Sequence, residues 1–290
     1  MSRGRTAAAF GVLIAATGGA AAGLYLWSEQ RPAEPPTFRC SAVLGESTST
    51  LTAEQAGYAA LIAAVSEGRD LPARATTIAL ATAMQESSLR NLDYGDRDSL
   101  GLFQQRPSQG WGTEAEVQDP YYSTGRFLDS LVRVDGWQDM EVTVAAQRVQ
   151  RSAFPDAYAR WETLGRMWAS ALRGQTGGVS VTCDVGEGDG TTPQDFADRI
   201  DADFGEDVYA VRVLDATDDD VWLDVAPTVD DAAARDALAS WAVAVAAEES
   251  VAAVSVGGEG WTAVDGLGPV DAPAGTIGAA IRLTLETPPG

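Results

Sequence analysis

The middle of the chain carries apolar residues at helical spacing. Residues 51–68, LTAEQAGYAALIAAVSEG, open with Thr52 and Gln55 at the spacing of a capping box and continue with an apolar face. A second helix is predicted over residues 71–91, LPARATTIALATAMQESSLRN, with Pro72 suited to its first turn. Its apolar face is formed by Leu71, Ala75, Ile78, Thr82 and Leu89. Glu86 lies at the edge of this face.

Three more helices are predicted before residue 174. Asp119 followed by Pro120 is typical of a helix start, and TVAAQRVQ, ending at Gln150, predicts a short helix. Residues 155–174 repeat aromatic and apolar side chains at about 3.6-residue spacing, which predicts one last helix. A polar, glycine-containing excursion, residues 93–113, follows the second helix. The pattern predicts an all-α domain over residues 48–183.

The C-terminal part shows a different pattern. VGEGDGTTPQ lies in a Gly-rich linker, residues 184–194. Beyond it, over residues 195–290, we expect a short helix at FADRI and strands at VYAVRVLD and VWLDVA. A helix over 230–247 and strands at VAAVSV, WTAV and IRLTLE should follow. This order predicts an α+β domain with an antiparallel sheet. Its acidic runs lack the spacing of a calcium loop, so we expect turn and helix-start charges, with no metal and no cofactor.

The N-terminus has the pattern of a membrane signal. After two arginines, residues 7–27 contain 21 residues without a charge, close to the roughly 20 that span a bilayer as a helix. We predict that residues 1–30 form a cytoplasmic start and a transmembrane anchor, with a cleaved secretory signal as the alternative. A Pro-rich spacer is expected over residues 31–47. Both alternatives place the rest of the chain outside the cytoplasm, in the cell envelope or secreted.

The two cysteines support that compartment. Cys40 and Cys183 bracket the predicted helical domain, and an even pair in an exported protein favours a disulfide over two free thiols. We therefore predict a Cys40–Cys183 bridge that ties the start of the domain to its end.

Composition narrows the chemistry. All 20 basic residues are arginines and the chain has no histidine, which excludes His-dependent nucleophiles, lysine Schiff bases and histidine metal ligands. The net charge is −22, and residues 184–290 hold 23 acids against 4 arginines. Such a charge disfavours nucleic acid as a partner, although the acidic C-terminal domain is open to a protein partner.

Glu86 is the candidate for chemistry. A carboxylate half turned toward an apolar core loses hydration of its charged form, so its pKa should rise. A carboxyl of raised pKa suits a general acid, the group that glycosidic bond cleavage needs to protonate the leaving oxygen. The alternative is an ordinary solvated or capping glutamate.

Three ordered motifs surround Glu86. The pair ES at Glu86 and Ser87, GLFQ at residues 101–104 and AAQRVQRSAFPDAYARWE at residues 145–162 together resemble the lytic transglycosylase and goose-type lysozyme superfamily. The stretch GLFQQRPSQGWGT, residues 101–113, is similar to actinobacterial exported lysozyme-like proteins. The resemblance covers about residues 48–173, under half of the chain.

The resemblance implies roles for particular residues. Glu86 would be the catalytic acid and Ser87 its companion. Trp111 would stack on a sugar ring, and Tyr158 would reach the cleft, although its place in an apolar stripe favours the core. Four residues would line the sugar-binding cleft, where the last would bond substrate or hold the loop: Gly101, Leu102, Phe103 and Gln104.

The resemblance implies a membrane-anchored enzyme that cleaves the β-1,4 bond between N-acetylmuramic acid and N-acetylglucosamine in peptidoglycan. A hydrolase would need a second carboxylate, for which Asp96 and Asp98 are candidates, although aspartate beside glycine also favours turns. A lytic transglycosylase would need none. The presence of the loop containing Gly95 and Asp96 favours the hydrolase. The alternative function is a non-catalytic wall-binding or scaffold protein with a lysozyme-like fold.

Overall fold

The computed structural model describes residues 38–151, 156–186 and 188–286. Residues Phe38–Gly290 form one compact unit by their internal contacts. The predicted membrane segment, residues 7–27, lies outside the described residues. Among the helices that the structure describes, none is both long enough and apolar enough to cross a bilayer.

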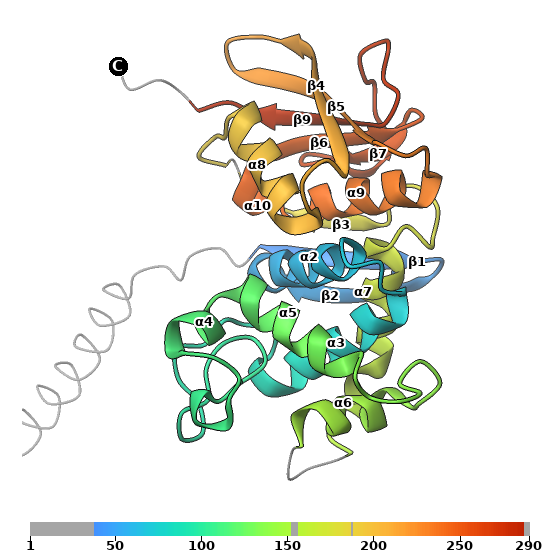
Figure 1. The fold of residues 1–290 in the computed structure, drawn as a ribbon. Helices are drawn as coiled ribbons and strands as arrows, with labels where there is room; N and C mark the ends of the chain where they lie inside the picture. The colour runs from blue at the N-terminus through green and yellow to red at the C-terminus, as the bar shows by residue number, and fades with distance from the viewer. Residues whose placement is uncertain (1–37, 152–155, 187, 287–290) are drawn as a thin grey trace, which may run out of the picture. The chain divides into compact units, whose positions relative to one another are not determined.

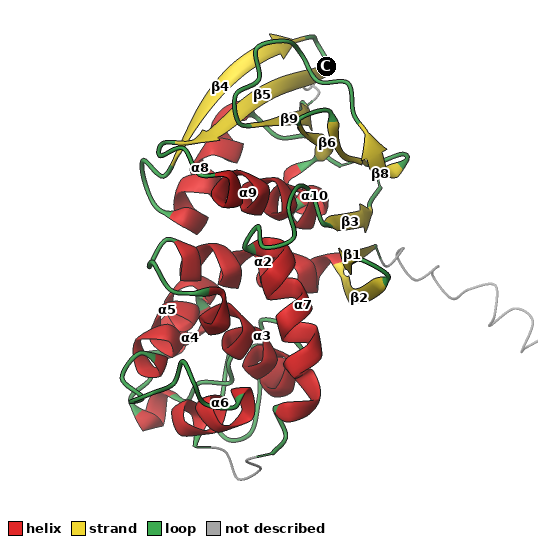
Figure 2. Cartoon of the chain, turned by 90° about the vertical axis from the view of Figure 1, so that its right-hand side faces the viewer, coloured by secondary structure: helices red, strands yellow, loops and turns green. Residues whose placement is uncertain are grey.

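Helices follow one another through the first half of the described chain (Figures 1 and 2). We call residues 53–172 the helical region. Its elements are α2 (Ala53–Glu67), α3 (Ala73–Ser87), the 3-10 turn η1 (Pro107–Gln109), α4 (Glu114–Gln118), α5 (Pro120–Leu131), α6 (Val142–Gln150), the 3-10 turn η2 (Ala159–Trp161) and α7 (Glu162–Leu172).

The predicted helix starts are largely confirmed. Thr52 caps α2 and forms the full capping box with Gln55. The side chain of Asp119 accepts hydrogen bonds from the first-turn amides of α5. The expectation of one helix over residues 155–174 is wrong, because α7 begins only at Glu162 and the turn η2 precedes it. Residues three apart in a 3-10 turn lie on the same side, and here Tyr158 and Trp161 both bond to α3.

A small antiparallel sheet is formed by strands that precede and follow the helical region in the chain. Strands β1 (Arg39–Leu44), β2 (Ser47–Thr52) and β3 (Val181–Asp184) pair in the order β2-β1-β3. The predicted disulfide is confirmed: Cys40 and Cys183 face each other across β1 and β3, with an S–S distance of 2.01 Å. β1 lies inside the segment that we expected to be a Pro-rich spacer. β1 pairs with its neighbour β2 as a hairpin and with β3 far along the chain. This sheet was not expected, since residues 48–183 were predicted to be all-α.

The C-terminal region, residues 191–286, confirms the predicted antiparallel α+β pattern. Its sheet has six strands in the order β4-β5-β9-β6-β7-β8, and α9 packs on β6 and β9 (Figure 1). The elements are α8 (Pro193–Phe204), β4 (Tyr209–Ala216), β5 (Asp220–Pro227), α9 (Ala232–Ala244), α10 (Ala246–Glu249), β6 (Val251–Val256), β7 (Glu259–Thr262), β8 (Gly266–Pro269) and β9 (Ala279–Thr284). The expected helix over 230–247 is interrupted at Val245, and β8 was not predicted.

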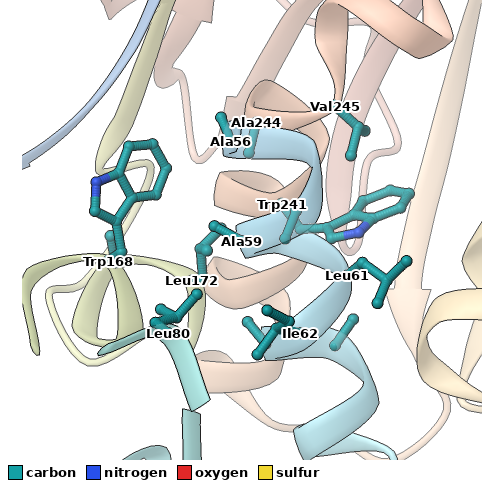
Figure 3. Close-up of a cluster of buried hydrophobic side chains, with 14 of the residues drawn as sticks. Ala56, Ala59, Leu61, Ile62, Leu80, Trp168, Leu172, Trp241, Ala244 and Val245 are labelled. Atoms are coloured by element: carbon teal, nitrogen blue, oxygen red, sulfur yellow. The ribbon is translucent and has the colours of Figure 1, made fainter. Parts of the chain in front are cut away.

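One hydrophobic core runs through both regions. Figure 3 shows Ala56, Ala59 and Leu61 of α2 in one cluster of buried side chains with Trp241 of α9. The alanines of α2 let neighbouring helices approach it closely, and α2 contacts α3, α5, α8 and α9. The C-terminal region therefore completes the burial of α2.

Candidate active site

Glu86 lies in the last turn of α3, where the helix stops because Ser88 and Leu89 adopt left-handed conformations, φ 55° and 56°. The side chain is half-buried. Burial raises the pKa of its carboxyl, while hydrogen bonds from Tyr158 and Gln150 act in the opposite direction. A pKa above the ordinary glutamate value keeps the acid form present at higher pH.

Tyr158 contributes both to the core and to this site. It is fully buried, and its hydroxyl donates to Glu86 Oε1 at 2.6 Å. Three residues later, Trp161 Nε1 donates to Gln85 Oε1 at 3.1 Å. The turn η2 therefore attaches to the end of α3 at two consecutive residues.

The segment 101–104 is attached to Glu86's surroundings through its backbone. Ser87 Oγ lies 2.7 Å from the carbonyl oxygen of Leu102, to which it donates. Gln150 Nε2 donates to the carbonyl oxygen of Phe103 at 2.8 Å. The side chains of Leu102 and Phe103 are fully buried, and the Phe103 ring stacks on Phe127 with centroids 4.7 Å apart. Any contact of these two residues with a ligand would therefore involve their main chain.

Two glycines permit close approaches in this loop. Gly101 has φ +77°, and a Cβ there would lie 2.2 Å from the carbonyl oxygen of Val117. A Cβ at Gly95 would lie 2.0 Å from Gln104 Oε1. Gln104 Nε2 donates to the carbonyl oxygens of Tyr94 and Gly101, at 3.2 and 3.3 Å. Gln104 thus holds the loop, the second of the two roles expected for it.

The two aspartates considered as a second carboxylate hold different positions. Asp98 accepts hydrogen bonds from Arg106 Nε at 2.8 Å, from the Ser108 amide at 2.7 Å and from Ser108 Oγ at 3.0 Å. The two hydrogen bonds from Ser108 and the one from Arg106 hold the pKa of Asp98 well below its usual value. Asp96 is exposed, with Arg97 3.9 Å away. Asp98 therefore serves the local conformation of the loop.

Trp111 lies half-buried farther along the same loop. Its carbonyl oxygen accepts from Tyr122 Oη at 3.2 Å and from Arg126 Nε at 3.3 Å. These bonds fix the backbone at Trp111 to α5.

Sequence reasoning singled out neither Gln150, which bonds to Glu86, nor Tyr94, whose carbonyl oxygen accepts from Gln104. Gln150 stands inside a quoted motif, but its bonds to Glu86 and to the loop depend on where α6 packs. Tyr94 is an aromatic side chain with 66% of its surface exposed, next to the loop that Gln104 holds. An aromatic residue within a polar excursion was a usable signal for Tyr94.

Comparison with protein-family models and with curated proteins finds no matching family model and no significantly similar protein. The chemistry of the site therefore follows from its geometry. In the part of the chain that the structure describes, no group of three or more acidic or cysteine side chains lies close enough to hold a metal ion. The arrangement offers one half-buried carboxylic acid, two donors to it and a tightly held loop.

Proposed function

We propose that this protein is a cell-envelope enzyme that cleaves the β-1,4 bond between N-acetylmuramic acid and N-acetylglucosamine in peptidoglycan, with Glu86 as the general acid. The observation that carries the proposal is the half-buried Glu86, whose pKa is raised by burial, beside the backbone-anchored segment 101–104. The Cys40–Cys183 bridge supports a place outside the cytoplasm. The ordered sequence motifs support the glycan as substrate.

The surroundings of Glu86 suit a general acid, which must hold a proton before the reaction and release it to the leaving group. Desolvation raises the pKa of the carboxyl, which favours the acid form that can protonate the leaving glycosidic oxygen. After transfer, hydrogen bonds from Tyr158 and Gln150 stabilise the carboxylate that remains. The acid is thus supported in both of its protonation states.

The proposed reaction ends in a 1,6-anhydro product. A hydrolase that inverts configuration needs a second carboxylate to position water. Asp98 already accepts bonds from Arg106 and Ser108, and Asp96 is exposed. The engagement of Asp98 favours the route without a second carboxylate, in which the 2-acetamido group of the substrate assists and the muramyl 6-hydroxyl closes the ring. This preference for a lytic transglycosylase is opposite to the preference for a hydrolase that the sequence alone gave.

The test is mass spectrometry of the soluble products released from purified peptidoglycan by residues 31–290. Glu86→Gln keeps the size of the side chain and should lower the rate by roughly 10²-fold or more, as loss of a general acid does. Asp96→Asn and Asp98→Asn serve as matched carboxylate controls and should retain anhydro-ended products. Equal digestion by Glu86→Gln would remove Glu86 from the mechanism. Binding of the wall without release by any of these proteins would instead indicate a non-catalytic wall-binding protein.

A further inference from the structure

Helix α5 supports the loop of the proposed site through its first turns. Tyr122 Oη donates to the carbonyl oxygen of Trp111, and the carbonyl oxygen of Ser123 accepts from Gln105 Nε2 at 3.0 Å. One turn farther on, Phe127 stacks on Phe103. The loop, residues 101–111, is therefore attached to α5 at Tyr122, Ser123, Arg126 and Phe127.

The residue beside these attachments belongs to a different contact. Tyr121 Oη donates to Asp203 Oδ1 at 2.6 Å, and Asp203 lies on α8 of the C-terminal region. Tyr121 and Tyr122 are consecutive residues in one helical turn. A displacement of Tyr121 therefore moves the attachment points of the loop with it, because the hydrogen-bonded backbone of a helix moves as a unit.

Asp203 is itself held firmly. Its side chain is completely buried, and it also accepts from Trp241 Nε1 at 2.6 Å and from Arg199 Nε at 2.9 Å. Arg199 in turn bonds Glu248 and Glu249 on α10. A buried carboxylate with three donors accepts little displacement, because each lost bond leaves a charge without compensation.

We propose that Asp203 and Tyr121 are positioning residues, through which the C-terminal region holds the loop 101–111 in the geometry of the proposed site. The catalytic consequence rests on the proposed function, whereas the mechanical coupling does not. The role of the acidic C-terminal region is then to support the proposed site: Asp203 fixes the first turn of α5, and α5 fixes the loop.

The test compares two Tyr→Phe variants that each remove a hydroxyl bonded between the regions. Tyr121→Phe removes the bond to Asp203. Tyr209→Phe is the matched control, since Tyr209 Oη bonds Ala234 O on α9 at 3.0 Å and Glu67 on α2 at 3.4 Å, and neither acceptor lies on α5. Amide hydrogen exchange of the full ectodomain is followed in peptides that cover residues 95–113. Protection there should fall about 10-fold in Tyr121→Phe and stay unchanged in Tyr209→Phe.

A positive control and an activity measurement complete the design. Tyr122→Phe removes the bond to Trp111 directly and should reproduce the loss of loop protection. On a soluble glycan, Tyr121→Phe should lower kcat/KM about 10-fold with a rise in KM, whereas a smaller folded fraction would lower the apparent kcat and leave KM unchanged.

The outcomes separate this inference from the proposed function. Unchanged loop protection in Tyr121→Phe, or an equal loss in the Tyr209→Phe control, would overturn the coupling. If the wild-type protein releases nothing from peptidoglycan, the proposed function fails, and hydrogen exchange still decides the coupling.

Discussion

Removal of the disulfide should cost much of the stability of the molecule. The bridge joins Cys40 on β1 to Cys183 on β3, which are 143 residues apart. The change is Cys40→Ala together with Cys183→Ala. Alanine avoids burying new hydroxyl groups at two positions that are only 1% and 5% exposed.

The magnitude follows from the length of the closed loop. For 143 residues, the chain-entropy relation gives about 5 kcal/mol at 25 °C. β1 and β3 keep a register of four residue pairs, from Arg39 opposite Asp184 to Ala42 opposite Val181. Because this pairing can persist without the bridge, most of the effect should arise in the unfolded chain, which gains conformational freedom. We expect the free energy of unfolding to fall by about 3–5 kcal/mol, since measured effects tend to lie below the entropic value.

Urea unfolding followed by tryptophan fluorescence provides the measurement. Trp168, Trp241 and Trp261 are fully buried, so unfolding should shift their emission to longer wavelength. Wild type treated with a reductant serves as the control, since it lacks the bridge but keeps both sulfurs. A loss below about 1 kcal/mol in both proteins would refute the reasoning that the bridge acts by constraining the unfolded chain.

Three further predictions concern single residues. Gly101→Ala places a Cβ 2.2 Å from Val117 O at φ +77°, so thermal unfolding should show a loss of about 2–4 kcal/mol; an unchanged melting temperature would contradict the close approach. Burial raises the pKa of Glu86 in the folded chain, so the folded protein binds the proton more tightly and its free energy of unfolding falls as pH rises through that window. Glu86→Gln should therefore melt higher than wild type at pH 7 and lose this advantage well below the ordinary carboxyl pKa; an advantage at every pH would argue against ionisation as the cause. Asp231→Ala removes the side-chain acceptor for two amides at the start of α9 and should cost about 1 kcal/mol by urea unfolding, whereas the neighbouring exposed Asp230→Ala should not.

Much of the fold followed from local chemistry. The capping box of Thr52 and Gln55 and the Asp119-Pro120 start signal placed two helices, because these motifs satisfy free amides within a few residues. The sheet of β1, β2 and β3 was not predicted, since β3 owes its conformation to a partner across the length of the helical region, and the hairpin of β1 and β2 was overlooked. The start of the last predicted helix, at residue 155, was wrong for a related reason. Tyr158 lies before the 3-10 turn η2, and its hydroxyl bonds to Glu86, which is distant in the sequence.

The candidate site was predictable only in part. Periodicity placed Glu86 at the edge of an apolar face near a helix end, and burial there accounts for its raised pKa. The contacts that complete the site join residues far apart: Tyr158 lies 72 residues after Glu86, and Asp203 lies 82 residues after Tyr121. No local pattern encodes such pairs, because they depend on how α6, η2 and α8 pack against the first helices.

The position of the disulfide has a consequence for biogenesis. In a chain translocated in the order of its sequence after the predicted N-terminal segment, Cys40 reaches an oxidising compartment long before Cys183, which follows 143 residues later. Until then its thiol is open to exchange with oxidoreductases. The disulfide can form only after β3 has crossed the membrane and paired with β1. A formed disulfide therefore indicates that the whole helical region has been translocated. A chain cut short before residue 183 would retain one reactive thiol, a chemical mark by which quality control can distinguish it from the finished protein.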